Sequence, residues 1–556
     1  MAPLLAGPAA AALLPLADHQ MVREAKHIVV ASVVSAGTRW NENHNLILTD
    51  YTLAVEDQLL GGAAARLRIT VAGGTLDGET HDTSLSTHLE VGHRYLLFLH
   101  DPDEPGFSPM VGGWQGVFRE VRTSAGPGRV AAGSHAEAMR VDGQEVEFAA
   151  FVEAVRAWIP RVLAAPAPAE PRAAAGRRHP PAKRYDPALA ATGGASLAPL
   201  SAASDAPDGP LLERDETWST AVERSTAADP DSTVDAYRYS RAAKRPIVFN
   251  QLPNGFSFAP HDQYMMSSWN VYAAKLFRVM AKPTNTWAWR DGRFDIAGFP
   301  PNSQMQKQFG RSWKANELGV TFFRWTSGPI IESDVALNPA FSWTTDERTA
   351  TGSGNSQSFR QTILHELGHA WGLSHPFDYQ NVWWDSVMNY PPRAYRLATL
   401  FADDAEAVRR AYSGTKIYDA AISAYRTRDA AASNHASYES ATPTPSTVAA
   451  GSTLVLSSAI KLENTGNTSI LNPSVEIYLV PQRFSWNGSH YLQTARFTTT
   501  LDSFSTVFLS LGTIRVPTTV PAGTYFLGYF FRDTKDANGS NNSAWSEWNN
   551  VVRVTR

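Results

Sequence analysis

Short segments of alternating apolar and polar residues dominate the first part of the chain. Four of them read HIVVASVV, LILTDYTLAV, RLRITVAGG and YLLFLHD, with Gly, Asp and Asn between them. Segments rich in β-branched residues and bounded by turn residues are typical of strands. Residues 145–165 differ, because their apolar positions recur three and four apart, which indicates a helix. We therefore expect residues 19–164 to form a β-barrel-like domain closed by a helix.

The alternating pattern returns in the last quarter of the chain. Its segments include TLVLSSAIKLENTGN, SVEIYLVP and TYFLGYFFRDT. Turn residues separate these segments roughly every 8–12 positions, which is the spacing of an all-β sandwich. The pattern predicts an Ig-like β-sandwich over residues 416–556.

Helical and strand-like patterns are mixed in residues 236–415. Apolar residues three and four apart in 261–281, 401–414 and FRQTILHELGHAWGL predict three helices. Asp403 and Asp404 would lie in the first turn of the last helix, where negative charge suits the helix dipole. Strand-like segments lie between the helices, so we expect an α+β domain.

Two segments do not have the composition of a packed domain. Residues 165–235 are dominated by Ala, Pro, Ser and Gly and are expected to form a linker. The first 18 residues are apolar and Ala-rich, as in a secretory signal, although a basic start is missing. We expect a signal segment and a secreted protein, and the alternative is an Ala/Pro-rich, disordered N-terminus.

Composition excludes several classes of function. The 556 residues contain no cysteine, which rules out disulfides, thiolate metal sites and cysteine nucleophiles. The formal net charge of −4 gives no electrostatic basis for binding nucleic acid. No later stretch has 18 uninterrupted apolar residues, so no transmembrane helix is expected.

The segment HELGHAWGLSH carries the candidate chemistry. On a helix, His365 and His369 are one turn apart on the same face and can share a metal ion, with Glu366 beside them. Gly372 can adopt a positive φ, end the helix and turn the chain back, so that His375 becomes a third ligand. Three imidazoles leave one zinc position open for water, as in a catalytic site.

Together with the following Ser386-Val387-Met388-Asn389-Tyr390, this segment resembles the metzincin zinc endopeptidases. FADDAEAVRRAYSG is similar to the matrixin terminal helix and GLSHPFDY to serralysins, so the chain lies between those families. The resemblance implies that Met388 packs beneath the zinc histidines and that Tyr390 hydrogen-bonds the oxyanion of the reaction. It also implies that residues 331–338 form the strand that lies along the substrate.

The motif therefore predicts a secreted zinc endopeptidase that acts on protein or peptide substrates. Glu366 is expected to act as general base on a zinc-activated water. Whether the fold also holds a structural Ca²⁺ ion stays open, because the sequence assigns it no ligands.

The alternative is a secreted adhesin or surface-binding protein with a silent protease fold. The C-terminal pieces ENTGN, PAGTYFLGYFFRD and EWNNVV resemble bacterial Ig-like cell-adhesion-related modules, which implies contact with a cell surface or matrix. Glu366 discriminates between the two hypotheses, since a degenerate site usually loses its base.

Overall fold

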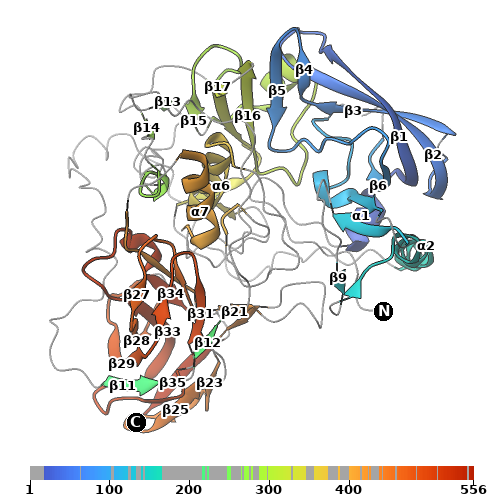
Figure 1. Cartoon of the computed structure of the whole chain (residues 1–556). Coiled ribbons are helices and arrows are strands. Elements are labelled where there is room, and N and C mark those ends of the chain that lie inside the picture. Colours follow the sequence, from blue (N-terminus) through green and yellow to red (C-terminus); the bar gives the residue numbers. More distant parts are fainter. Residues whose placement is uncertain are drawn as a thin grey trace.

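The computed structural model shows a β-rich chain with several sheets and few helices (Figure 1). Its described residues are 18–62, 64–101, 106–122, 127–132, 140–141, 144–165, 216–219, 222–224, 247–251, 265, 268–273, 277–279, 287–296, 298–326, 330–345, 356–373, 386–388, 400–412, 416–423, 425–427, 438–440, 442–456, 460–483, 485–509, 511–546 and 550–556. Within these residues, no helix has the length and apolar character needed to cross a membrane.

The N-terminal unit is an antiparallel sheet with two helices. Six strands follow the order β3-β2-β1-β6-β7-β8. Apolar residues of α1, α2 and one sheet face form one core, and the opposite face contributes to a second. The elements of this unit are α1 (Asp18–Glu24), β1 (His27–Trp40), β2 (Ile47–Leu60), β3 (Arg66–Ala72), β4 (Gly74–Leu76), β5 (Glu79–Thr83), β6 (Arg94–Leu99), η1 (Gly113–Gly116), β7 (Val117–Val121), β8 (Arg129–Ala132), β9 (Arg140–Val141), β10 (Gln144–Glu145) and α2 (Phe148–Ala164).

This unit is an open sheet rather than the β-barrel-like domain that the sequence predicts. The strand order ends on β3 and β8, and no pairing joins these two edges among the described strands. The chain leaves the sheet after β3 at Gly73 and Gly74, whose φ values are 98° and 133°. Of the next two strands, β5 pairs with β16 of the central unit and β4 pairs with β5, so neither closes a barrel.

The central unit contains a sheet with helices packed on it. Strand β13 lies between β14 and β15 in parallel, and β15 is followed by a parallel bridge from Gly298 to Ala336 in β17. β17 pairs antiparallel with β16, and β16 pairs antiparallel with β5. The elements of this unit are β13 (Ile247–Gln251), β14 (Phe277–Val279), β15 (Asp295–Ile296), α5 (Asn302–Phe309), β16 (Gly319–Thr326), β17 (Ile330–Leu337), β18 (Ser342–Thr344), β19 (Ser356–Ser358), α6 (Phe359–Ala370) and α7 (Ala402–Tyr412).

The helix predicted over residues 261–281 is wrong at its C-terminal end. Residues 268–270 are helical, but Phe277–Val279 form β14, which pairs with β13. Aromatic and β-branched residues favour a pleated sheet. The backbone of Phe277–Val279 therefore pairs with β13 instead of continuing the helix. The helices predicted around residues 145–165 and 401–414 correspond to α2 and α7.

The C-terminal unit has two main sheets and smaller ones, among them β23-β25-β32, which share one apolar core. One sheet has the order β11-β29-β28-β33-β35-β24, and the other has the order β12-β31-β26-β20. The elements are β11 (Glu216–Ser219), β12 (Val222–Arg224), β20 (Ala420–Ser423), β21 (Tyr425–Thr427), β22 (Tyr438–Ser440), β23 (Pro443–Thr444), β24 (Thr447–Ala449), β25 (Thr453–Leu456), β26 (Ile460–Asn464), β27 (Ile470–Leu471), β28 (Ser474–Val480), β29 (His490–Phe497), β30 (Thr500–Leu501), β31 (Thr506–Leu509), β32 (Thr513–Arg515), β33 (Gly523–Phe531), η4 (Gly539–Asn541), β34 (Ser543–Trp545) and β35 (Val551–Thr555).

Two strands of this unit come from the segment expected to be a linker. β11 pairs parallel with β29, and β12 pairs antiparallel with β31. The low apolar content of residues 165–235 did not indicate this, because edge strands are held mainly by backbone hydrogen bonds.

Candidate active site

His365 and His369 face each other on the buried helix α6. Their Nε2 atoms are 3.0 Å apart, and their rings meet nearly at right angles. The helix begins at Ser358, whose hydroxyl accepts a hydrogen bond from the backbone N–H of Gln361. Almost every residue of α6 is buried, so the sheet and α7 hold both imidazoles in place.

Both imidazoles direct their unprotonated nitrogens at the same point. The Nδ1–H of His365 donates to the carbonyl of Val387 at 2.7 Å, and that of His369 donates to Leu373 at 2.9 Å. Burial lowers the pKa of His365 to about 4, and burial with the charge of His365 lowers the pKa of His369 well below 6.5. Two neutral rings with both Nδ1 atoms protonated present two lone pairs to each other. This donor set fits a divalent cation that accepts imidazole nitrogen, such as Zn²⁺.

Glu366 is fully buried beside this pair. Its Oε2 accepts hydrogen bonds from Thr321 Oγ1 at 2.5 Å and from Ser84 Oγ at 3.3 Å. Its Oε1 is buried and accepts no hydrogen bond from the described residues. Burial raises the pKa of Glu366 to about 7, although the two hydroxyl donors lower it. A carboxyl group whose pKa lies near neutrality suits a general base.

Gly372 and Gly368 shape the helix around the histidines. Gly372 has φ +85°, and the turn that it makes places the Leu373 carbonyl at His369 Nδ1. Gly368 was not singled out by the sequence, although it lies between the two histidines. A Cβ at Gly368 would lie 2.9 Å from a ring carbon of Trp269 and 3.0 Å from the methyl carbon of Met388. Only glycine therefore allows this close approach of Met388 to α6.

Asp404 holds the segment that carries Met388. Its Oδ1 accepts from Ser386 Oγ at 2.6 Å and from Met388 N at 3.2 Å, and its Oδ2 accepts from Val387 N at 2.9 Å. Burial raises the pKa of Asp404 to about 6 despite these hydrogen bonds. Because Val387 in turn accepts from His365, Asp404 acts on the histidine through the backbone. Sequence reasoning missed this role, since a first-turn Asp has an ordinary explanation in the helix dipole.

Two predicted site residues lie outside the described residues. His375, the expected third ligand, falls in 374–385, and Tyr390 falls in 389–399. Among the described residues, no group of three or more His, Asp or Glu side chains is placed to hold a metal ion. The described part of the site therefore comprises His365, Glu366 and His369, with Gly372 and Met388 beside them.

The strand predicted to lie along the substrate is paired along one edge and at the C-terminal end of the other. β17 contains residues 331–337, and it pairs with β16 on one side. On the other side Leu337 N donates to the Gly298 carbonyl, and Gly298 N donates to that of Val335. An extended peptide needs an edge with unpaired backbone groups. The C-terminal end of β17 is therefore not available to an added peptide, and the antiparallel strand whose Thr321 contacts Glu366 is β16.

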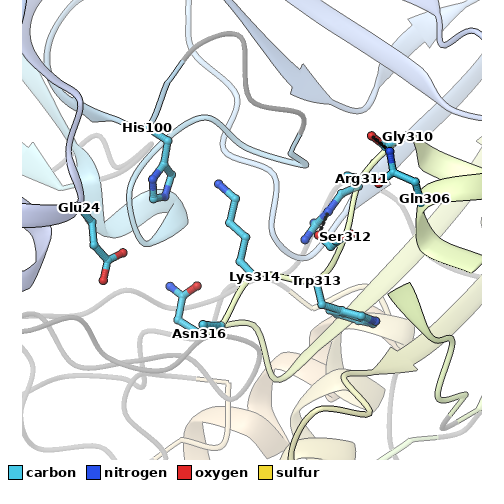
Figure 2. Close-up of a pocket in the computed structure, with 10 residues that line it drawn as sticks. Glu24, His100, Gln306, Gly310, Arg311, Ser312, Trp313, Lys314 and Asn316 are labelled. Carbon is cyan, nitrogen blue, oxygen red and sulfur yellow. Dashed lines mark hydrogen bonds between the residues drawn. The ribbon is translucent and has the colours of Figure 1, made fainter. Parts of the chain in front are cut away.

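A separate pocket of about 480 Å³ lies between the N-terminal and central units. It is lined by Glu24, His100, Gln306 and residues 310–316. Figure 2 shows Glu24 and His100 of the N-terminal unit facing Lys314 of the central unit. Burial, together with the charge of Lys314, lowers the pKa of His100 to about 4. None of the lining residues belongs to the histidine site.

Comparison with known proteins supports a peptidase of the metzincin type. A family model described as Matrixin matches residues 306–413, which include β16, β17, α6 and α7. This match supports a metallopeptidase over that part of the chain. No curated protein gives a significant match.

Two solved structures of a CARDB domain from Pyrococcus furiosus are similar to part of the chain. One is a crystal structure in complex with di-metal ions; it is 15% identical, covers 25% of this chain and 96% of that chain, and has a TM-score of 0.15. The other is a solution NMR structure; it is 14% identical, covers 25% and 98%, and has a TM-score of 0.13. These scores carry no argument about the fold or ligands of this chain.

Proposed function

We propose that this chain is a secreted zinc-dependent endopeptidase with its active site on α6. The observation that carries the proposal is the pair of buried Nε2 atoms, 3.0 Å apart, whose rings are oriented by backbone carbonyls. Glu366 directly follows the first of these histidines, and the Matrixin match covers the same helix. Secretion is inferred from the composition of the first 18 residues.

His365 and His369 would hold the zinc ion, and His375 is proposed as the third ligand. When bound, zinc supplies a Lewis acid that acidifies a water molecule and polarises the substrate carbonyl. The hydrogen bonds from both Nδ1–H groups fix the tautomer in which Nε2 carries the lone pair that would bind a metal. Met388 packs against Gly368 of the helix that carries the ligands.

Glu366 would transfer the proton in the reaction. Thr321 holds Oε2, so Oε1 is the carboxylate oxygen left to accept a proton from the attacking water. Glu366 then passes the proton to the leaving amine, which restores the carboxylate. Tyr390 is proposed to donate a hydrogen bond to the oxyanion that develops on the substrate.

The domain division follows the same proposal. We propose residues 236–415 as the catalytic domain, residues 19–164 and 416–556 as flanking domains, and residues 165–235 as a connecting segment whose strands β11 and β12 pair with the C-terminal unit. The C-terminal domain is proposed to contact a cell surface or matrix. The substrate would be a protein or peptide in an extended conformation.

Metal binding tests the proposal without reference to any substrate. The wild-type chain, dialysed against Zn²⁺ and then against metal-free buffer, should retain about one zinc ion per chain. His369→Ala should lose it, whereas Glu366→Gln should keep it, because the carboxylate is not a ligand. Equal zinc content in the wild type and His369→Ala would contradict the assignment of the site.

A further inference from the structure

The hairpin β4–β5 of the N-terminal unit extends the sheet of the central unit. β5 pairs antiparallel with β16, from Glu79 opposite Thr326 to Thr83 opposite Phe322. β16 is therefore covered on both sides, by β17 and by β5. Figure 1 shows β4 and β5 directly beside β16 and β17, at the boundary between the two units.

Ser84 continues this pairing up to the candidate general base. Its backbone N–H donates to the Thr321 carbonyl at 2.9 Å, and its hydroxyl oxygen accepts from Thr321 N at 2.9 Å. The same hydroxyl donates to Glu366 Oε2 at 3.3 Å. The end of the β5 segment, which we define as residues 79–84, thus touches the side chain proposed to move the proton.

Charged and apolar contacts hold the β5 segment in place. Glu79 Oε1 is 2.7 Å from Arg324 Nη1, and Glu79 Oε2 is 2.8 Å from Arg290 Nη2. Leu85 and Phe107 share an apolar core with residues of the central unit, including Phe322. The contact therefore joins backbone pairing, two ion pairs and a common core.

We propose that the β5 segment inhibits the site in cis by occupying the edge of β16 that an extended peptide substrate would use. This inference rests on the proposed peptidase function. A peptide can add to a sheet only where a strand presents unpaired N–H and C=O groups. From Thr321 to Trp325, the backbone of β16 is paired on both sides. The cysteine-free chain has no thiolate to cap a zinc ion, and the β5 segment provides a different form of latency.

A reversible cross-link tests this inference because the chain has no other cysteine. Glu79 lies directly opposite Thr326. The hydrogen bond from Ser84 N to Thr321 O makes that pair hydrogen-bonded, so by alternation Glu79 and Thr326 form a non-hydrogen-bonded pair, which has close Cβ atoms. Glu79→Cys/Thr326→Cys locks β5 onto β16 when oxidised. When reduced, it lacks both ion pairs of Glu79 and holds the segment more weakly.

Ser35→Cys/Thr52→Cys is the matched control, because these residues form a cross-strand pair within β1 and β2, remote from β16. Hydrolysis of labelled casein by zinc-loaded protein is compared with and without a phosphine reductant. If detachment of the β5 segment from β16 limits substrate binding, reduction of the Glu79→Cys/Thr326→Cys disulfide should raise kcat/KM roughly tenfold or more. The increase should be proportional to the fraction of molecules in which the segment is detached. Reduction of the control pair should change little.

Hydrogen exchange gives a readout that does not depend on activity. The amides of Phe323 and Trp325 face β5, whereas those of Phe322 and Arg324 face β17, by the alternation from Thr321. In a Glu366→Gln background, reduction of the β5–β16 pair should speed exchange at Phe323 and Trp325 only. This outcome also shows that the reduced protein remains folded.

Two results would overturn the inference, and only one of them also contradicts the peptidase proposal. Equal casein hydrolysis by the oxidised and reduced forms, with faster exchange on reduction, means that the β5 segment does not block the site; the peptidase proposal then stands. No hydrolysis by any zinc-loaded form contradicts the peptidase proposal itself and this inference with it.

Discussion

Ser84 Oγ lies 3.3 Å from Glu366 Oε2, although 282 positions separate the two residues in the chain. The hydroxyl belongs to the N-terminal unit and the carboxylate to the helix that carries the histidine pair. Any account of activity therefore has to include the N-terminal unit.

Thr321 is predicted to position Glu366. Thr321→Val removes the 2.5 Å hydrogen bond to Oε2 but keeps the shape of the side chain. Because this bond lowers the pKa of Glu366, its loss should raise that pKa and move the acid limb of the kcat/KM profile to higher pH. Thr321→Ser retains the hydroxyl and should behave like the wild type. An unchanged acid limb in Thr321→Val would exclude this role.

Gly368→Ala should destabilise the central unit. The added methyl group meets Met388 and a ring carbon of Trp269, both of which are buried. Overpacking of this kind costs about 1–3 kcal/mol of unfolding free energy. Gly37→Ala is the control, because no atom lies within 4 Å of a Cβ at that position. Urea unfolding measures both variants, and equal midpoints would contradict the packing described.

Asp404→Ala should weaken zinc binding without removing a ligand. The backbone of Val387 and Met388 loses its acceptor, and the Val387 carbonyl orients His365. Loss of such a supporting group typically lowers metal affinity about 10–100-fold. Glu406→Ala, on the same helix and paired with Arg410, should bind zinc like the wild type. A zinc competition assay with a chromogenic chelator compares them, and equal affinities would refute the role of Asp404.

Acid should release the β5 segment through His81, which packs between Trp40 and Trp289. Burial lowers its pKa to about 4, with Arg290 and Arg324 contributing and Glu79 opposing. The unfolded value is about 6.5. The folded protein therefore disfavours the proton, so the stability associated with neutral His81 is present above about pH 6.5 and is lost as the pH falls towards 4.

The titration of Glu79 does not offset the loss of stability that protonation of His81 causes. Burial raises its pKa, but the hydrogen bonds and charges of Arg324, His81 and Arg290 lower it to about 2. Glu79 thus stays ionised from pH 6.5 to 4.5, and its own contribution is lost only below that range. Amide exchange at Phe323 and Trp325, corrected for intrinsic rates, should speed up between pH 6.5 and 4.5. His81→Phe should remove most of this dependence, and pH-independent exchange in the wild type would contradict the prediction.

Local sequence patterns predicted where the helices of the site lie, but not which strands pair beside them. The helix with His365 and His369 follows from apolar residues three and four apart, and α7 follows from the same periodicity. The pairing of β5 with β16 could not be predicted, because an alternating pattern identifies a strand but not its neighbour. Ser84 and Thr321 are 237 positions apart, and no residue type between them specifies this contact.

The sequence also did not predict which side chains support the histidines and Glu366. Asp404 is one of two adjacent acidic residues, and only the position of residues 386–388 distinguishes it from Asp403. The open N-terminal sheet and the pairing at the C-terminal end of β17 were not predicted, for a shared reason. Both depend on strand partners: the β4–β5 hairpin pairs with β16, and Gly298 pairs with Val335 and Leu337 of β17.

Hydrolysis of casein by zinc-loaded protein, with and without a chelator, tests the central claim most directly. The wild type and the reduced Glu79→Cys/Thr326→Cys variant are each compared with the same chain carrying Glu366→Gln. The account predicts hydrolysis that the chelator abolishes and Zn²⁺ restores, and a loss of roughly 10²–10⁴-fold in kcat in the Glu366→Gln forms, which still bind zinc. Hydrolysis that survives zinc removal, or that proceeds at an unchanged rate in the Glu366→Gln forms, would contradict it.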